Sequence, residues 1–142
     1  MSFRWLDMRI AEEKERRQRD ALVQERLPRA LDELRDNLKQ CVADYCAAFG
    51  AEAAEAVPAG DSVQVTVRMR TGGEWRESAR VLVSVIPEMP GFRVERGGKT
   101  VEIEVGTLPG DKLLFKHGEH YLTMDQVTQV ILDPALFPDL AA

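Results

Sequence analysis

A chain of 142 residues has room for one compact domain, because a single core usually takes about 100–200 residues, and we expect residues 1–142 to form one. A hydrophobic fraction of 44% and a charged fraction of 30% are typical of a folded chain and exclude a disordered one. No apolar run approaches the ~18 residues that cross a bilayer, so we expect no integral membrane association. The formal net charge of −5 argues against a surface of phosphate-binding lysine and arginine, so no nucleic-acid partner is expected.

The amino terminus and the cysteines favour a cytoplasmic location. Residues 1–5 lack the charged head, the apolar run and the small-residue cleavage site of a secretory signal. Cys41 and Cys46 are five positions apart, which turns them about 140° away from each other on a helix. We therefore expect no disulfide between them, and a protein of the cytoplasm.

Glycine and proline divide the chain into a helical part and a strand-rich part. Residues 3–49 contain no Gly and one Pro, whereas all ten Gly and six of the seven Pro lie from Gly50 onward. In residues 27–49 apolar residues recur at alternating spacings of four and three, which predicts a helix with one apolar face. This face consists of Leu27, Leu31, Leu34, Leu38, Cys41, Tyr45 and Ala48. Its width favours a helix that covers the chain's own sheet over a dimer seam.

Residues 1–26 are expected to project as a helical arm. Residues 12–20 offer no apolar face to a core, so their side chains are expected in solvent. Pairs of Glu and Arg four positions apart, with the acid first, each add about 0.2–0.5 kcal/mol to a helix. The pairs are Glu12 with Arg16, Glu13 with Arg17, and Glu15 with Arg19. Pro28 predicts a kink or a new helix start, since proline inside a helix costs ~3 kcal/mol.

Alternation of apolar and polar residues predicts an antiparallel meander of about five strands over residues 61–122. Around Gly72 and Gly73, a pairing of Val65 with Val81 requires an odd-length loop or a β-bulge. A two-residue turn at Gly97 and Gly98 pairs Phe92 with Ile103 and Arg93 with Glu102.

A short helix is expected over residues 123–133. Thr123 is its N-cap, and Gln126, three positions later, completes a capping box. Asp133 and Pro134 are expected to end the helix. The fold class is therefore α+β: a long amino-terminal helix, an antiparallel meander and a short carboxy-terminal helix.

One cluster of metal-ligand residue types occurs in the sequence. His117, Glu119 and His120 surround Gly118, and a tight turn could bring their donor atoms to one ion. The spacing matches no metal signature, and a glycine-centred hairpin needs no function to explain it. The turn interpretation is therefore favoured over the metal site.

The sequence contains no known catalytic motif. No GxSxG, phosphate loop or dinucleotide fingerprint occurs, so we expect no cofactor and favour a protein that is not an enzyme. The rival hypothesis is a small-ligand-binding or hydrolytic domain with a pocket between a curved sheet and the long helix. Its lining would include Tyr45, Trp75, His120 and Tyr121.

The most informative feature is an apolar tip at the start of the arm. It consists of Phe3, Trp5, Leu6, Met8 and Ile10, which the charged stretch separates from the apolar face of residues 27–49. Aromatic and methionine side chains in such positions are typical anchors of protein interfaces. Docking on another chain is favoured over folding back onto the chain's own sheet and over insertion into a membrane surface. We therefore hypothesise a non-enzymatic interaction or scaffold protein, most simply a homodimer, with an adaptor or chaperone as a further alternative.

Overall fold

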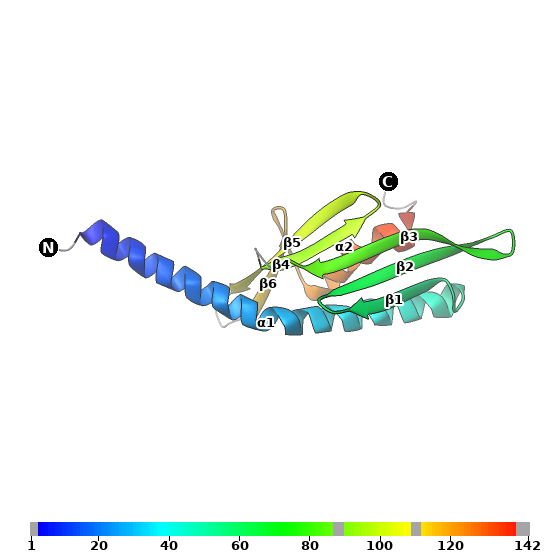
Figure 1. The fold of residues 1–142 in the computed structure, drawn as a ribbon, viewed down its shortest axis with the longest axis horizontal. Helices are drawn as coiled ribbons and strands as arrows, with labels where there is room; N and C mark the ends of the chain where they lie inside the picture. Colours follow the sequence, from blue (N-terminus) through cyan, green and yellow to red (C-terminus); the bar gives the residue numbers. More distant parts are fainter. Residues whose placement is uncertain (1–2, 87–89, 109–111, 139–142) are drawn as a thin grey trace.

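A long helix, an antiparallel sheet and a short helix make up the fold, which is α+β as expected from the sequence (Figure 1). The computed structural model describes residues 3–86, 90–108 and 112–138. The elements are α1 (Arg4–Phe49), β1 (Ala54–Ala59), β2 (Ser62–Thr71), β3 (Glu74–Val85), β4 (Gly91–Arg96), β5 (Lys99–Leu108), β6 (Lys112–His117), β7 (His120–Leu122) and α2 (Met124–Leu136). Neither helix carries, within the described ranges, an apolar stretch long enough to cross a bilayer.

The sheet is a meander in which each strand pairs antiparallel with the next one in sequence, in the order β1 to β7. It has seven strands rather than five, and it begins at Ala54 rather than near residue 61. The two additional strands lie at its edges. β1 has the sequence AEAVPA, which contains three alanines and a proline, and β7 has three residues. Such segments carry little intrinsic strand signal, so their pairing with β2 and β6 is what makes them strands.

A β-bulge resolves the pairing of β2 with β3. Gly72 and Gly73 form a two-residue turn, with φ values of 61° and 83° that favour glycine. The register shifts between Val67 and Arg68, so that Ser78 is the extra residue on β3. Beyond the bulge Val65 pairs with Val81, as the alternation predicted. Of the two solutions that the sequence left open, the bulge is the one the structure adopts.

The β4–β5 hairpin follows the predicted register. Phe92 pairs with Ile103 on the buried face, and Arg93 pairs with Glu102 on the outer face, where Arg93 Nη2 donates to Glu102 Oε1 over 3.4 Å. Phe92 also stacks on Phe115 of β6, with ring centroids 6.3 Å apart. Residues of one parity therefore fill the core while those of the other parity remain polar and accessible.

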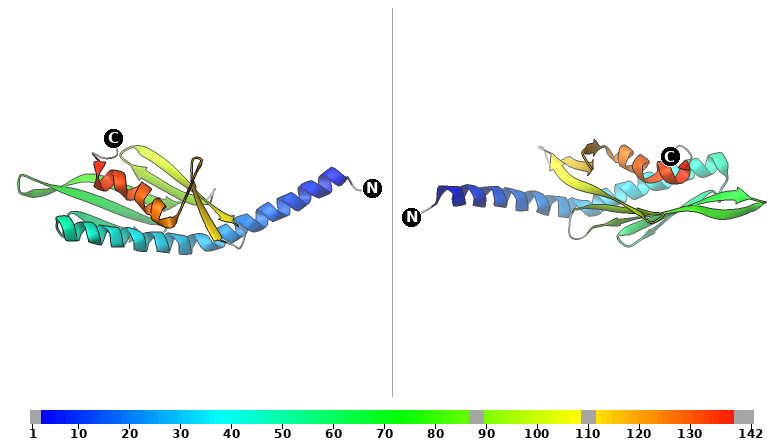
Figure 2. Two further views of the ribbon diagram at one scale, coloured as in Figure 1. Left: turned by 180° about the vertical axis from the view of Figure 1, so that it is seen from behind. Right: turned by 90° about the horizontal axis from the view of Figure 1, so that it is seen from above.

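α1 is one continuous helix through Pro28, so the predicted fresh start does not occur. The helix axis changes direction where the arm meets the half that covers the sheet (Figure 2). Pro28 is exposed and leaves the carbonyl of Gln24 without its helical N–H partner, which explains the bend. Leu27 and Ala30 on either side are buried, and their packing holds the helix together across this point.

Burial along α1 begins at Val23, four residues before the predicted start of the sheet-covering half. From there the helix buries a continuous face that includes Leu34 and Leu38, neither of which has any exposed surface. Both helices lie against the same face of the sheet (Figure 2). One hydrophobic cluster joins them to the inner face of the strands.

α2 starts at the predicted cap and ends later than predicted. Thr123 Oγ1 accepts from the backbone N–H of Gln126 over 3.2 Å, while Gln126 Oε1 accepts from the N–H of Thr123 over 2.9 Å. The helix continues through Pro134 to Leu136. Pro134 removes only one hydrogen bond in the last turn, and burial of Leu132 and Ala135 holds that turn in place.

Candidate functional site

Residues 4–21 of α1 extend away from the rest of the molecule and form a projecting arm (Figure 1). Between Phe3 and Ala21 every side chain is exposed except that of Glu13, which is half-buried. The structure therefore places the arm in solvent, and it does not fold back onto the sheet. A helix so far from its own core has to be stabilised by contacts within itself or by another molecule.

Ion pairs along the arm supply part of that support. Glu13 pairs with Arg17 at 3.1 Å, as expected, and also with Arg16 at 2.6 Å. The other two expected pairs are replaced by neighbours on the same turns. Glu12 binds Arg9 at 3.2 Å, Arg16 also binds Asp20 at 3.2 Å, and no ion pair joins Glu15 to Arg19 in the described structure. Spacings of three and of four both bring side chains together on a helix, so pairs three positions apart form here besides pairs four apart.

Glu13 is the centre of this network. Hydrogen bonds from Arg16 and then from Arg17 lower the pKa of its carboxyl group from an ordinary 4.5 to about 2. The same contact raises the pKa of Arg16. The arm therefore carries a fixed carboxylate surrounded by guanidinium groups, near its middle.

The apolar tip lies at the free end of the arm. The exposed fraction is 55% for Phe3, 65% for Trp5, 40% for Leu6, 57% for Met8 and 45% for Ile10. The rings of Phe3 and Trp5 touch each other at a tilted angle, with centroids 6.5 Å apart. Five large apolar side chains on one exposed helix end have the composition and exposure that are typical of an interaction surface.

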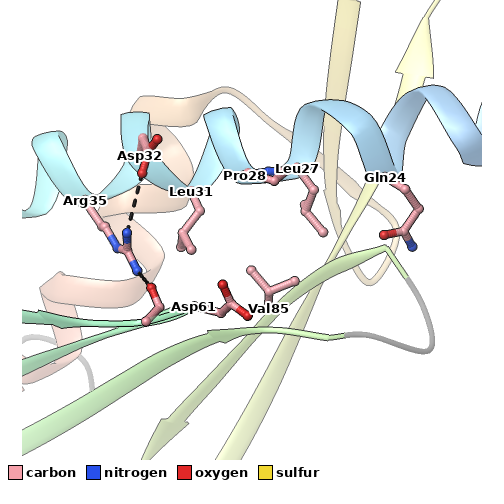
Figure 3. A pocket seen from close by; sticks show the side chains of 9 residues that line it. Gln24, Leu27, Pro28, Leu31, Asp32, Arg35, Asp61 and Val85 are labelled. Carbon is pink, nitrogen blue, oxygen red and sulfur yellow. Dashed lines mark hydrogen bonds and ion pairs between the residues drawn. The ribbon is translucent and has the colours of Figure 1, made fainter.

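A small pocket lies at the base of the arm, where α1 meets the β1–β2 turn (Figure 3). Its volume is about 280 Å³, slightly below the ~300–1,000 Å³ of typical ligand sites. It is lined by Gln24, Leu27, Pro28, Leu31, Asp32, Arg35, Gly60, Asp61 and Val85. No sequence pattern predicted this pocket, although a proline inside a helix signals backbone irregularity that can open such a space.

Arg35 fixes one wall of this pocket. Its Nη2 donates to the carbonyl oxygens of Gly60 and of Ser62, the second over 3.0 Å, and its Nη1 lies 3.4 Å from Asp32 Oδ1. Nε of Arg35 is buried and has no hydrogen-bond partner within the described part of the chain. These contacts attach α1 to the β1–β2 turn, so the base of the arm is rigidly placed.

The three predicted metal ligands lie in and beside the β6–β7 turn. His117 ends β6 and pairs in register with His120, the first residue of β7, while Glu119 is an exposed turn residue. Gly118 has a φ of 61°, a conformation that suits glycine in a hairpin. Across residues 3–86, 90–108 and 112–138, no three His, Cys, Asp or Glu side chains form a metal-binding group.

The four residues expected around a ligand pocket lie in two separate places. Tyr45 is half-buried near the end of α1, and Trp75 lies against the nearby Gly50, where an added Cβ would be 3.1 Å from its ring. His120 and Tyr121 belong to β7 at the opposite edge of the sheet from β1. Tyr121 is 64% exposed, and Lys116 lies 5.9 Å from the centre of its ring.

Tyr45 instead joins a second apolar surface at the carboxyl end of α1. Its ring lies 4.8 Å from that of Phe49 and 5.8 Å from that of Phe137, measured between centroids. Phe49 is 60% exposed. The three rings cover part of one another's apolar surface. This cluster therefore depends less on another molecule to cover it than the tip does.

The arrangement of the arm suits binding rather than chemistry. Glu12, Glu13 and Asp20 form ion pairs with arginines along a solvent-exposed helix. The apolar side chains of the arm are grouped at its end. Catalytic acids and bases need a partly dry site that shifts their pKa toward the working pH, whereas Glu13 is shifted away from it. Comparisons of the chain with protein-family models, with curated proteins and with solved structures found no match in any of the three.

Proposed function

We propose that this is a cytoplasmic, non-enzymatic interaction or scaffold protein that associates with a second copy of itself through the arm. The observation that carries the proposal is the apolar tip, with five large side chains each 40% or more exposed at the end of the arm. Two free, half-buried cysteines, Cys41 and Cys46, agree with a reducing compartment.

The energetics favour a partner that covers several tip residues at once. Burying one large apolar side chain completely contributes about 1.5–3 kcal/mol. Association costs about 4–15 kcal/mol in lost freedom of motion, so one or two buried side chains are not enough. In a symmetric homodimer every contact occurs twice, and two tips together supply ten apolar side chains.

Mass in solution tests the proposal. Light scattering of the full chain should give twice 16.0 kDa at high protein concentration and a lower average mass on dilution. A variant without residues 1–20 should stay at one chain mass and keep the melting temperature that the full chain has when dilute, because the buried face of α1 begins at Val23. A full chain that weighs one copy at every concentration, or a shortened chain that still pairs, contradicts the proposal.

A further inference from the structure

A second, larger groove lies where α1, β6 and the first residue of α2 meet (Figure 2). Its volume is about 550 Å³, within the ~300–1,000 Å³ of typical ligand sites. From α1 it is lined by residues at spacings of three and four, which lie on one side of a helix, and these include Arg26, Arg29 and Glu33. None of its lining residues belongs to the apolar tip.

The charged residues around the groove are mostly basic. They are Arg26, Arg29 and Lys112 against one carboxylate, Glu33, although the whole chain has a net charge of −5. Glu33 follows Arg29 by four positions, yet no ion pair joins the two in the described structure, and none joins Lys112 to any described residue. Arg29 and Lys112 therefore keep positive charges that the protein does not compensate. A cleft lined by charges of one sign raises the local concentration of the opposite ion, so this groove attracts anions.

The other side chains of the groove are apolar. Leu113 and Met124 are half-buried, which leaves part of each accessible from the groove, whereas Phe115 is only 6% exposed. The accessible surface is therefore that of flexible aliphatic side chains and not that of an aromatic ring. A bare anion would leave this surface in water. An anion with an aliphatic body would cover it.

We propose that the groove binds a small aliphatic carboxylate, such as a medium-chain carboxylic acid in its ionised form. The planar guanidinium of Arg29 matches the two oxygens of a carboxylate, and Lys112 adds a second positive charge. The alkyl chain packs against Leu113 and Met124 and leaves water. This ligand site goes beyond the scaffold function proposed above, and it depends neither on the tip nor on self-association.

Calorimetric titration of the full chain with sodium octanoate tests the site. Binding should saturate, and Arg29→Gln should weaken it by roughly fivefold or more, because a charge-assisted hydrogen bond is lost. Arg19→Gln removes the same charge from the arm, outside the groove, and should change it by less than about twofold. Both arginines are exposed, so neither substitution should lower the melting temperature. Equal effects of the two substitutions, or no binding of millimolar octanoate, overturn the proposal.

Changes in the ligand test its two ends separately. Each CH₂ added between hexanoate and octanoate should strengthen binding by up to about fourfold, because it buries apolar surface. The neutral 1-octanol should bind roughly fivefold more weakly than octanoate or worse, and acetate should show no measurable binding. Octanol that binds as tightly as octanoate indicates an apolar surface such as the tip. Acetate that binds as tightly indicates a bare anion on basic side chains, and either result overturns the proposal.

Discussion

Arg17 donates a hydrogen bond from its Nε to Glu13 over 3.1 Å, one helical turn back along the exposed arm. Arg16 donates two more to the same carboxylate, from Nη2 over 2.6 Å and from Nε over 3.0 Å. These three bonds keep Glu13 charged well below the pH at which a glutamate ordinarily takes up a proton, since they lower its pKa to about 2. The centre of the arm is therefore a stable arrangement of opposite charges.

The pH dependence of the arm follows from this pKa. A carboxyl group whose pKa is lower in the folded state contributes stability that is complete above its ordinary pKa of 4.5 and is lost as the pH falls through about 2. A carbon-13 NMR titration should give a Glu13 midpoint near 2, while a variant with both Arg16→Gln and Arg17→Gln should titrate near 4.5. A midpoint near 4.5 in the unchanged chain contradicts the ion-pair geometry.

Leu34 and Leu6 provide a comparison between the core and the arm. Leu34 has no exposed surface, so Leu34→Ala should lower the free energy of unfolding by about 2–5 kcal/mol. Leu6 is 40% exposed at the tip, so Leu6→Ala should lower it by less than about 0.5 kcal/mol when the protein is dilute enough to be monomeric. Urea denaturation measures both. Similar losses in the two variants would mean that the tip packs against its own chain.

Gly91 lies where β4 passes very close to β5. A Cβ on this residue would lie 2.4 Å from the carbonyl oxygen of Ile103, so Gly91→Ala should destabilise the fold by about 1–3 kcal/mol. Gly106 is the control, because a Cβ there meets no atom within 4 Å. Thermal unfolding of Gly91→Ala and Gly106→Ala should separate the two positions. A Gly91→Ala protein as stable as the control refutes the close approach.

Substitutions of Thr123 test how much the capping box of α2 contributes to stability. Thr123→Ala removes the oxygen that accepts from the Gln126 N–H and should cost about 1 kcal/mol of stability. Thr123→Ser keeps a hydroxyl in the same place and should cost much less. Chemical denaturation of both variants gives the difference, and equal losses would assign the effect to the lost methyl group instead.

Much of the fold is predictable because periodicity reports which side of an element is buried. The spacing of Leu27, Leu31, Leu34 and Leu38 gave the buried face of α1, and alternation gave the pairing of Phe92 with Ile103. The capping box at Thr123 could also be predicted from the sequence, because both of its hydrogen bonds join residues only three positions apart. The exposed tip followed from composition, because nine charged or polar positions separate it from the core face.

Other features depend on neighbours that are distant in the sequence. The sequence of β1 shows no strand pattern, and the segment is a strand because it pairs with β2. Pro134 remains helical because residues of α2 on either side of it are buried in the core. The pocket at the base of the arm needs the β1–β2 turn, which Arg35 of α1 brings to the helix. Local patterns and composition therefore determined the elements, the buried faces and the candidate arm. Only tertiary structure decided the sheet edges, the continuity of α1 and the pocket, because these arise where separate segments compete for the same hydrogen bonds and the same space.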